Sequence, residues 1–267
     1  MPFETHEQNG LIWLSASVLS GVRHGFSTRL GGVSPAPWDS LNLRPGMGDG
    51  REAMLENYRR FCACLGAEPE HTVLSRQVHE TTVRACTADD AGKGLFRDRD
   101  YSADALITNT PGLTLFVFSA DCGTILLHDP DTNAVGAIHA GWRGCARGIV
   151  EKTVQELERL YGAKAANLRA ALGPCIGQCC FETNSDVPDA MRAALGETAA
   201  PYLAQHGPKW HVDLEGLNRQ WLLRAGVLAK HIDTAGLCTA CRPDWFWSHR
   251  KMGETRGLQC AAIVCPS

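Results

Sequence analysis

The fold of this chain is decided by residues 119–144, which read SADCGTILLHDPDTNAVGAIHAGWRG. Two short apolar runs, Leu113–Phe118 and Thr124–Leu127, flank the Ser-Ala-Asp-Cys turn at its start, and a third run, Ala134–Ile138, leads into His-Ala-Gly-Trp-Arg-Gly. Short apolar runs that end at Gly, Asp or Pro are typical of buried strands. The stretch therefore predicts three strands, with a Cys at one strand junction and a His at another.

Three side chains at the ends of apolar runs are candidate metal ligands. His79 ends the run Thr72–Val78, and Cys122 and His139 belong to the central stretch. Two imidazoles and one thiolate suit zinc, with a fourth position left open for water or substrate. The three residues are 43 and 17 positions apart, which matches no zinc-knuckle spacing. From residue types alone, a buried core Cys and hydrogen-bonded His side chains are the simpler interpretation.

The composition is that of an ordinary globular chain. Its 267 residues are 44% hydrophobic and 21% charged, with a net charge of −3, so a sizeable core is available and nothing indicates a nucleic-acid or membrane-surface partner. The first ten residues carry Glu4 and Glu7 and no apolar stretch, which argues against a signal peptide. No apolar run approaches the roughly 20 residues of a membrane helix. We expect a soluble, cytoplasmic protein.

The twelve cysteines are expected to be reduced, and most of them to pack as small hydrophobic residues. Cys238-Thr-Ala-Cys241 is a lone CxxC, and a zinc ribbon would need a second such pair. Because the adjacent residues Cys179 and Cys180 lack that spacing, we predict no second metal. For Cys175 and Cys179, simple packing is favoured over a role at the candidate site.

The order of the elements indicates the fold class. Because many expected strands follow one another directly, the chain does not fit a doubly wound parallel sheet. We predict an α+β fold, a single domain over residues 1–267, with mixed β-sheets and helices packed outside them. The expected helices are Met54–Leu65, Ile149–Leu160, Asp186–Leu195 and Asp213–Ala225; further strands are expected at Leu11–Leu14, Val22–Ser27, Thr82–Cys86, Asp104–Thr108, Leu168–Leu172, Ile232, Trp245–Trp247 and Leu258–Val264, and loops at Pro35–Gly50 and Ala88–Tyr101.

Three arginines are candidates for binding an anion such as phosphate. Arg29 lies in a turn with two glycines, Arg143 directly precedes an expected helix N-terminus, and Arg250 lies in a basic cluster on an expected strand-to-strand turn. Guanidinium groups and helix N-termini both favour phosphate. Solvated surface arginines are the alternative. The chain has no Walker loop and no GxGxxG, so a P-loop or Rossmann nucleotide site is not indicated.

Taken together, seven motifs resemble one protein family, the polyphenol oxidase or laccase-domain proteins, also called multicopper-oxidase-like proteins or peptidoglycan editing factors. They run from about residue 22 to the C-terminus. The motifs are His24-Gly-Phe-Ser-Thr-Arg29, Gln77-Val-His79, Asp104-Ala-Leu-Ile-Thr108, Ala120-Asp-Cys122, His139-Ala-Gly-Trp-Arg-Gly144, Gly173-Pro-Cys-Ile-Gly177 and Phe246-Trp-Ser-His-Arg250.

The resemblance implies a single α+β domain with a zinc ion held by His79, Cys122 and His139. It also implies phosphorolysis of adenosine, inosine and S-methyl-5′-thioadenosine, with adenosine deamination as a second activity. The chain departs from the family pattern in two places. Ser-His-Arg-Lys replaces the more usual Ser-Tyr-Arg-Arg, and Cys175 stands at a variable position; both could alter substrate preference.

Three other activities remain open from the sequence. Blue-copper sites also use two His and one Cys, so a copper polyphenol oxidase is possible, although the chain lacks the His-x-His pairs of a laccase copper cluster. Without metal, Cys122 as nucleophile and His139 as base would make a cysteine hydrolase. An amidase that edits peptidoglycan precursors would use the same residues. A purely binding role is disfavoured by the open metal position.

Overall fold

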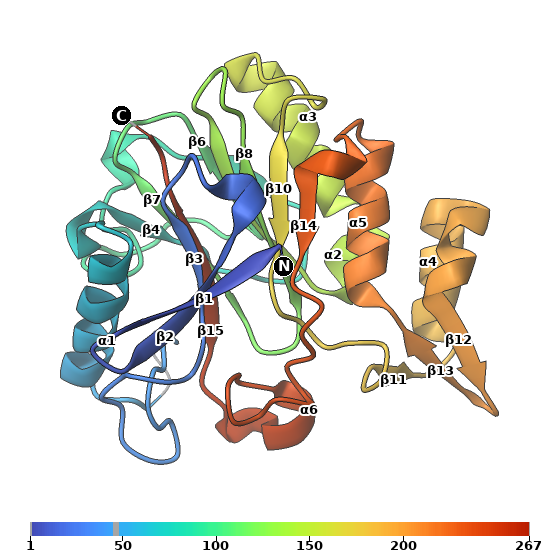
Figure 1. Ribbon diagram of the computed structural model, residues 1–267, viewed down its shortest axis with the longest axis horizontal. Helices are drawn as coiled ribbons and strands as arrows, with labels where there is room; N and C mark the ends of the chain where they lie inside the picture. The colour runs from blue at the N-terminus through green and yellow to red at the C-terminus, as the bar shows by residue number, and fades with distance from the viewer. Residues whose placement is uncertain (1, 45–47, 267) are drawn as a thin grey trace.

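Two six-stranded sheets pack face to face, and helices cover their outer faces (Figure 1). This computed structural model describes residues 2–44 and 48–266. The first sheet has the order β1 (Phe3–Gln8), β2 (Leu11–Ala16), β3 (His24–Ser27), β15 (Gln259–Val264), β7 (Thr114–Ser119) and β4 (Thr72–Leu74). The second has the order β14 (Ile232–Thr234), β10 (Arg169–Leu172), β8 (Gly123–His128), β9 (Val135–Ala140), β6 (Ala105–Thr108) and β5 (Val83–Ala85).

The central strands are buried on both faces because alternate side chains enter different cores. In β7, Leu115 and Val117 join the core between the two sheets, whereas Phe116 and Phe118 point to the opposite side. This is the two-residue period of a strand. The apolar runs of the central stretch therefore become the inner strands of two sheets that share one core.

Helices complete the two outer cores. α1 (Arg51–Cys64) covers the first sheet, where Tyr58 and Phe61 pack against Phe116. The second sheet is covered by α3 (Ile149–Tyr161) and α5 (Leu214–Arg224), which share a core with its strands. Figure 1 shows α1 on one side of the sheets and α3 and α5 on the other.

Smaller elements lie at the periphery. A three-stranded sheet, β11 (Glu182–Thr183), β13 (Lys209–Val212) and β12 (Leu203–His206), lies beside α4 (Asp186–Leu195) at one end of the molecule (Figure 1). Two short helices, α2 (Trp142–Ala146) and α6 (His249–Met252), begin inside two of the sequence motifs. The 3-10 helices are Ser17–Leu19, Pro69–His71, Ala88–Asp90, Gly196–Tyr202, Ala229–His231 and Gly253–Thr255.

The predicted fold class, α+β with mixed sheets and helices outside them, is confirmed. The extent of the domain, residues 1–267, stays a prediction. The expected helix Asp213–Ala225 is confirmed in detail, because the Asp213 carboxylate accepts the N–H of Gly216 as an N-cap at 2.9 Å. Part of the predicted loop Pro35–Gly50, residues 45–47, lies outside the described residues.

The predicted strand Trp245–Trp247 is wrong. The backbone N–H groups of Trp245 and Phe246 both bond to the carbonyl of Arg242, which makes a turn. The N–H of Trp247 is taken by the side chain of Gln259 at 2.7 Å. Side-chain and turn bonds thus replace the ladder that this aromatic run would need as a strand. Every helix among residues 2–44 and 48–266 is too short or too polar to span a bilayer.

Candidate metal centre

The structure brings the three predicted ligands together. The ligand atoms of His79, Cys122 and His139 all lie within 4.8 Å of one another. The two imidazole rings have centroids 5.0 Å apart and are nearly perpendicular, at 83°. His79 follows β4, Cys122 lies in the turn between β7 and β8, and His139 is near the end of β9. Three segments that are distant in sequence therefore converge on one point.

Strand register explains why a carboxylate stands beside His139. β6 and β9 are antiparallel, with Ala105 opposite Ile138, so the residue before Ala105 lies opposite His139. That residue is Asp104, whose side chain is completely buried. The N–H of His139 also donates to the backbone carbonyl of Asp104 at 2.7 Å.

Asp104 holds both histidines. Its carboxylate lies 2.8 Å from Nδ1 of His139 and accepts the backbone N–H groups of Val78, His79 and Glu80 at 3.0–3.1 Å. A carboxylate that accepts Nδ1–H fixes the tautomer and leaves Nε2 free to bind a metal ion. Burial opposes the charge of this carboxylate, but its hydrogen bonds outweigh burial and lower the pKa of Asp104. Asp104 therefore positions one ligand directly and the other through its backbone.

The electrostatics favour a thiolate at Cys122. Burial by itself disfavours the charged thiolate, but His139 and His79 outweigh burial and lower the pKa of Cys122 to about 6. Burial likewise disfavours a charged His139, but Cys122 and Asp104 outweigh it and raise its pKa to about 9. Each of the two groups therefore favours the charged form of the other. The thiolate is the form that binds metals.

Close backbone contacts fix the remaining ligand positions. A Cβ at Gly141 would lie 2.9 Å from the Cys122 sulfur and 3.3 Å from Cδ2 of His79, so this position requires glycine. The side-chain amide of Gln77 donates to the carbonyl of Phe118 and accepts its N–H, both at 2.7 Å. Gln77 thereby ties the segment that carries His79 to the end of β7.

Asp121, the residue before Cys122, is held in a left-handed conformation with φ of 88°. Its carboxylate accepts the Thr239 hydroxyl and the backbone N–H of Arg250, both at 2.6 Å. Its carbonyl accepts the N–H of Ile176 at 2.8 Å. Three segments from elsewhere in the chain, namely the loop after β10, the loop that contains Thr239 and the first turn of α6, therefore secure the turn that presents Cys122.

Two pockets meet at the ligands. The first, of about 530 Å³, reaches His79, Cys122 and His139, and among the described residues its lining contains four arginines and no carboxylate; these are Arg44, Arg76, Arg99 and Arg256. The second, of about 420 Å³, reaches His79 and Cys122 from another side. Its apolar lining consists of Ala120, Trp142, Ile176, Phe181 and Leu214. The candidate metal position thus lies between a basic pocket and a partly aromatic one.

The three predicted arginines are placed differently. Arg143 and Arg250 line the aromatic pocket. Arg143 is exposed and stacks on Trp142, whereas Arg250 donates to the carbonyls of Cys180 and Glu182. Arg143 lies inside the five-residue helix α2 rather than before a long helix.

Arg29 lies in neither pocket. It stacks on Trp247, 3.9 Å from the ring centroid, and donates to the carbonyls of Asp39 and Pro243. These contacts place Arg29 in a structural position, and its role in binding phosphate stays a prediction.

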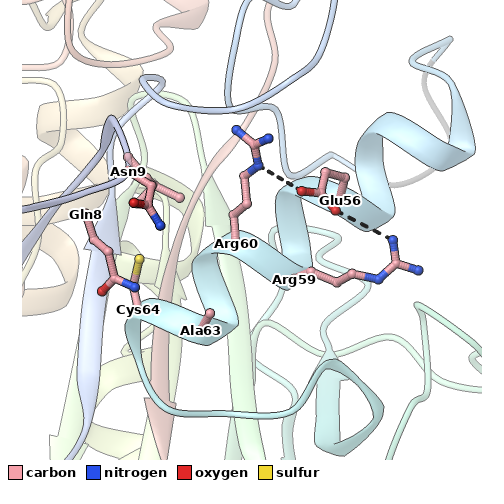
Figure 2. Close-up of a pocket in the computed structure, with 8 residues that line it drawn as sticks. Gln8, Asn9, Glu56, Arg59, Arg60, Ala63 and Cys64 are labelled. Atoms are coloured by element: carbon pink, nitrogen blue, oxygen red, sulfur yellow. Dashed lines mark hydrogen bonds and ion pairs between the residues drawn. The ribbon is translucent and has the colours of Figure 1, made fainter.

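A further pocket, of about 410 Å³, lies between the β1–β2 turn and α1 (Figure 2). Its charged groups already pair with each other, because Glu56 contacts Arg59 at 3.7 Å and Arg60 at 2.9 Å. Burial raises the pKa of the Cys64 thiol in this pocket, which disfavours a reactive thiolate. We therefore assign it no role in the chemistry.

The donor set fits a zinc ion. Two neutral imidazole nitrogens and one thiolate match a three-ligand catalytic zinc site, and the carboxylate behind His139 supplies the expected outer partner. The adjoining pockets leave room for a fourth ligand.

Comparison with known proteins agrees with this architecture. The family described as multi-copper polyphenol oxidoreductase laccase matches residues 23–266. The chain belongs to this family. It is 34% identical over 260 residues to the purine nucleoside phosphorylase YlmD of Geobacillus stearothermophilus, which covers 96% of this chain and 95% of that protein. It is 36% identical over 243 residues to the purine nucleoside phosphorylase YfiH of Escherichia coli, covering 91% and 93%.

Solved structures of similar proteins have the same fold. The crystal structure of YlmD from Geobacillus stearothermophilus superposes with a TM-score of 0.92 and 32% identity, covering 100% of this chain and 99% of that one. The YfiH protein of Bacillus licheniformis also gives a TM-score of 0.92, with 30% identity and 98% coverage of both chains.

Several site residues were not predicted as such. Asp104 and Gln77 belong to the recognised motifs, but their roles depend on which strands are neighbours, which spacing does not reveal. The arginines of the basic pocket come from four separate segments. A charged residue at the start of an otherwise apolar strand was the available signal for Asp104.

Proposed function

We propose that this chain is a zinc-dependent purine nucleoside phosphorylase that acts on adenosine, inosine and S-methyl-5′-thioadenosine, with adenosine deamination as a second activity. The observation that carries this proposal is the position of His79, Cys122 and His139 between a basic and a partly aromatic pocket. The names of the relatives YlmD and YfiH support the nucleoside phosphorylase class.

The basic pocket suits inorganic phosphate. Guanidinium groups bind phosphate oxygens through paired, charge-assisted hydrogen bonds. Arg76 is exposed at the pocket, and Arg99 is anchored there because it donates to the carbonyl of Ser75 at 2.8 Å. Arg143 and Arg250, in the other pocket, are the alternative phosphate ligands.

The partly aromatic pocket suits a purine nucleoside. Trp142 and Phe181 offer flat surfaces for the base, and Ile176 and Leu214 add apolar contact. In phosphorolysis, a phosphate oxygen bonds to C1′ of the ribose as the bond from C1′ to the base breaks. The bonding pair leaves with the base, which takes up a proton, and ribose 1-phosphate forms. The arginines would hold phosphate and offset the negative charge.

Zinc would be held by His79, Cys122 and His139. When bound, it would supply a Lewis acid beside the two pockets. Asp104 keeps His139 in the tautomer that can bind it. Deamination would exchange the C6 amino group of adenosine for the oxygen of water and release ammonia.

The test is to incubate purified protein with adenosine, with and without inorganic phosphate, and to quantify adenine, ribose 1-phosphate and inosine. Phosphate-dependent formation of adenine and ribose 1-phosphate is expected, and Cys122→Ala should abolish it. Cys64→Ser, which removes a thiol from the unrelated pocket, is the matched control. Equal activity in Cys122→Ala and wild type would overturn the zinc-centred proposal.

A second candidate function uses the same residues without metal. Cys122, His139 and Asp104 are arranged as a nucleophile, a base and an orienting carboxylate, which is the order of a cysteine hydrolase. An amidase that edits peptidoglycan precursors would belong to this class. Exhaustive chelation separates the two: it should abolish phosphorolysis, whereas a metal-free hydrolase would keep its activity.

The family description also names copper-dependent polyphenol oxidation. The described residues contain one other cluster of metal-binding side chains, and it consists of cysteines rather than the histidines of a laccase copper cluster. Oxygen uptake with a phenol after copper loading tests this activity. We expect uptake far below the rate of phosphorolysis.

A further inference from the structure

Four cysteines meet in a second cluster, away from the candidate active site. The sulfur atoms of Cys179, Cys180, Cys238 and Cys241 all lie within 4.8 Å of one another. Cys241 is 3.5 Å from Cys179 and 3.4 Å from Cys180, sulfur to sulfur. The expectation that the CxxC lacks a partner pair is therefore wrong. The partner pair is the adjacent Cys179 and Cys180, which a turn folds onto the CxxC.

The spacing of the sulfur atoms fits one metal ion. Four thiolates placed tetrahedrally about zinc, each about 2.3 Å from the metal, have sulfur atoms roughly 3.8 Å apart. The separations of 3.4 and 3.5 Å lie slightly below that value, and all four sulfur atoms lie within 4.8 Å of one another. A cluster of four iron atoms would hold its cysteines farther apart, so a single ion is the better fit.

The backbone at Gly177 lies close to the sulfur atoms of the cluster. The N–H of Gly177 donates to the Cys238 sulfur at 3.2 Å, which stabilises a thiolate. A Cβ at Gly177 would lie 3.1 Å from Cβ of Cys238 and 3.4 Å from the Cys179 sulfur, so glycine gives the backbone the close approach. The Arg250 guanidinium donates to the carbonyl of Cys180 at 3.0 Å and partly offsets the charge that four thiolates would carry.

We infer that Cys179, Cys180, Cys238 and Cys241 form a second, structural zinc site. The ion would bind four thiolates and release the protons of the thiols. Because protein ligands fill all four positions, the site is closed and holds no water or substrate, unlike the His79–Cys122–His139 centre. This inference does not rest on the proposed nucleoside activity.

The site would join two of the segments that hold Asp121. The loop after β10 donates the N–H of Ile176 to the Asp121 carbonyl, and the loop that contains the CxxC donates the Thr239 hydroxyl to its carboxylate. The ion would therefore support the turn that presents Cys122. It would also fix Phe181, which follows Cys180 and lines the partly aromatic pocket.

The first test is the zinc content of protein purified under reducing conditions, measured by plasma mass spectrometry. We expect about two zinc ions per chain for wild type and about one for the double variant Cys238→Ser/Cys241→Ser. Cys122→Ala should also hold about one, and the control Cys64→Ser about two. If only the active-site proposal fails, wild type and Cys122→Ala both hold about one ion, and the double variant none.

A second measurement keeps the inference testable if the double variant fails to fold. In the Cys122→Ala background, a thiol reagent is applied to native protein before and after metal removal, and modified cysteines are identified by peptide mass spectrometry. The four cluster cysteines should become reactive only after removal. Reactivity of all four before metal removal, a disulfide among them, or iron in place of zinc would each overturn the assignment.

Discussion

At the scale of single residues, the candidate centre is organised by one buried carboxylate behind the predicted ligands. Asp104 accepts four N–H donors, one from His139 and three from the backbone around His79. It therefore sets the distance between two ligands from different sheets. A residue outside the predicted ligand set thus positions two of its members.

Asp104→Asn should separate the ligands without adding bulk. Asparagine offers one oxygen where the carboxylate offers two, so its NH₂ group would face N–H donors. Loss of this outer partner is expected to weaken zinc binding by about 10- to 100-fold. Competition with a chromogenic chelator measures the change. The control is Glu80→Gln, because the Glu80 side chain pairs with Arg147 at the surface. Equal zinc affinities in the two variants would contradict the role of Asp104.

Gly141→Ala should weaken zinc binding at the candidate centre by a steric clash, without changing any charge. The added methyl group would stand 2.9 Å from the Cys122 sulfur, closer than real contacts allow, so the ligand turn must shift. We expect reduced zinc occupancy in a protein that still folds, read out by metal analysis and circular dichroism. Gly21→Ala, where nothing lies within 4 Å, is the matched control. Normal occupancy in Gly141→Ala would disprove this steric account.

At the scale of elements, the junction of β2 and β3 depends on a neutral histidine. Nε2 of His24 accepts the N–H of Ala16 at 2.8 Å, and Nδ1 donates to the carbonyl of Val22 at 2.8 Å. Both ring nitrogens are therefore hydrogen-bonded, and a proton added at Nε2 would break the bond from Ala16. Burial is the main cause of the lowered pKa of His24, because the charged form loses its hydration.

The stability of the protein should therefore fall as the pH falls below 6.5. With the folded pKa below the ordinary value of 6.5, the unfolded chain binds more protons in this window, so unfolding is favoured as protons are added. The contribution of neutral His24 to the free energy of unfolding is fully present above pH 6.5 and is lost as the pH falls through the folded pKa. Urea unfolding between pH 5 and pH 8 measures it. His24→Gln should show a smaller slope than wild type, while the exposed control His71→Gln should keep the full slope.

Local patterns predicted the inner elements and missed the peripheral ones. The apolar runs around Cys122 are strands because both of their faces are buried, and Asp213 and Gly226 bound α5 through local chemistry. β1 and the sheet of β11, β12 and β13 were missed because these short strands, which are mostly exposed or half-buried, carry no apolar run.

The candidate site could be predicted only in part, because some of its contacts depend on segments that meet only in the folded chain. Residue chemistry and the family motifs offered His79, Cys122 and His139, and the structure brings them together. The role of Asp104 follows from the register of β6 with β9. The four-cysteine cluster follows from two turns that meet only in the folded chain. Long-range pairing of this kind leaves no trace in spacing.

At the scale of the whole molecule, the two six-stranded sheets and their end loops create two pockets of different character around one centre. The basic pocket lies beside the ends of β4 and β7, and the partly aromatic pocket beside α2 and the loop after β10. This arrangement would let two substrates approach the candidate ion from separate sides. Variants in one pocket should therefore affect one substrate.

Arg76→Gln should raise the KM for phosphate and leave the KM for adenosine nearly unchanged. Loss of one hydrogen bond to a charged group corresponds to about a 10- to 100-fold effect. Steady-state phosphorolysis with each substrate varied in turn separates the two constants. Arg59→Gln, in the unrelated pocket of Figure 2, controls for the loss of surface charge. An equal rise for both substrates would contradict separate binding pockets.

The place of β15 in the first sheet has a consequence for synthesis. This strand, Gln259–Val264, lies between β3 and β7, although these two strands come from the first half of the chain. A ribosome makes the chain from its N-terminus, so β3 and β7 leave the exit tunnel long before the strand that joins them. During that interval the early strands expose unpaired edges, which are sites of aggregation. Translation speed and chaperones that shield nascent strands should therefore affect the yield of this protein more than that of a protein whose sheet closes in chain order.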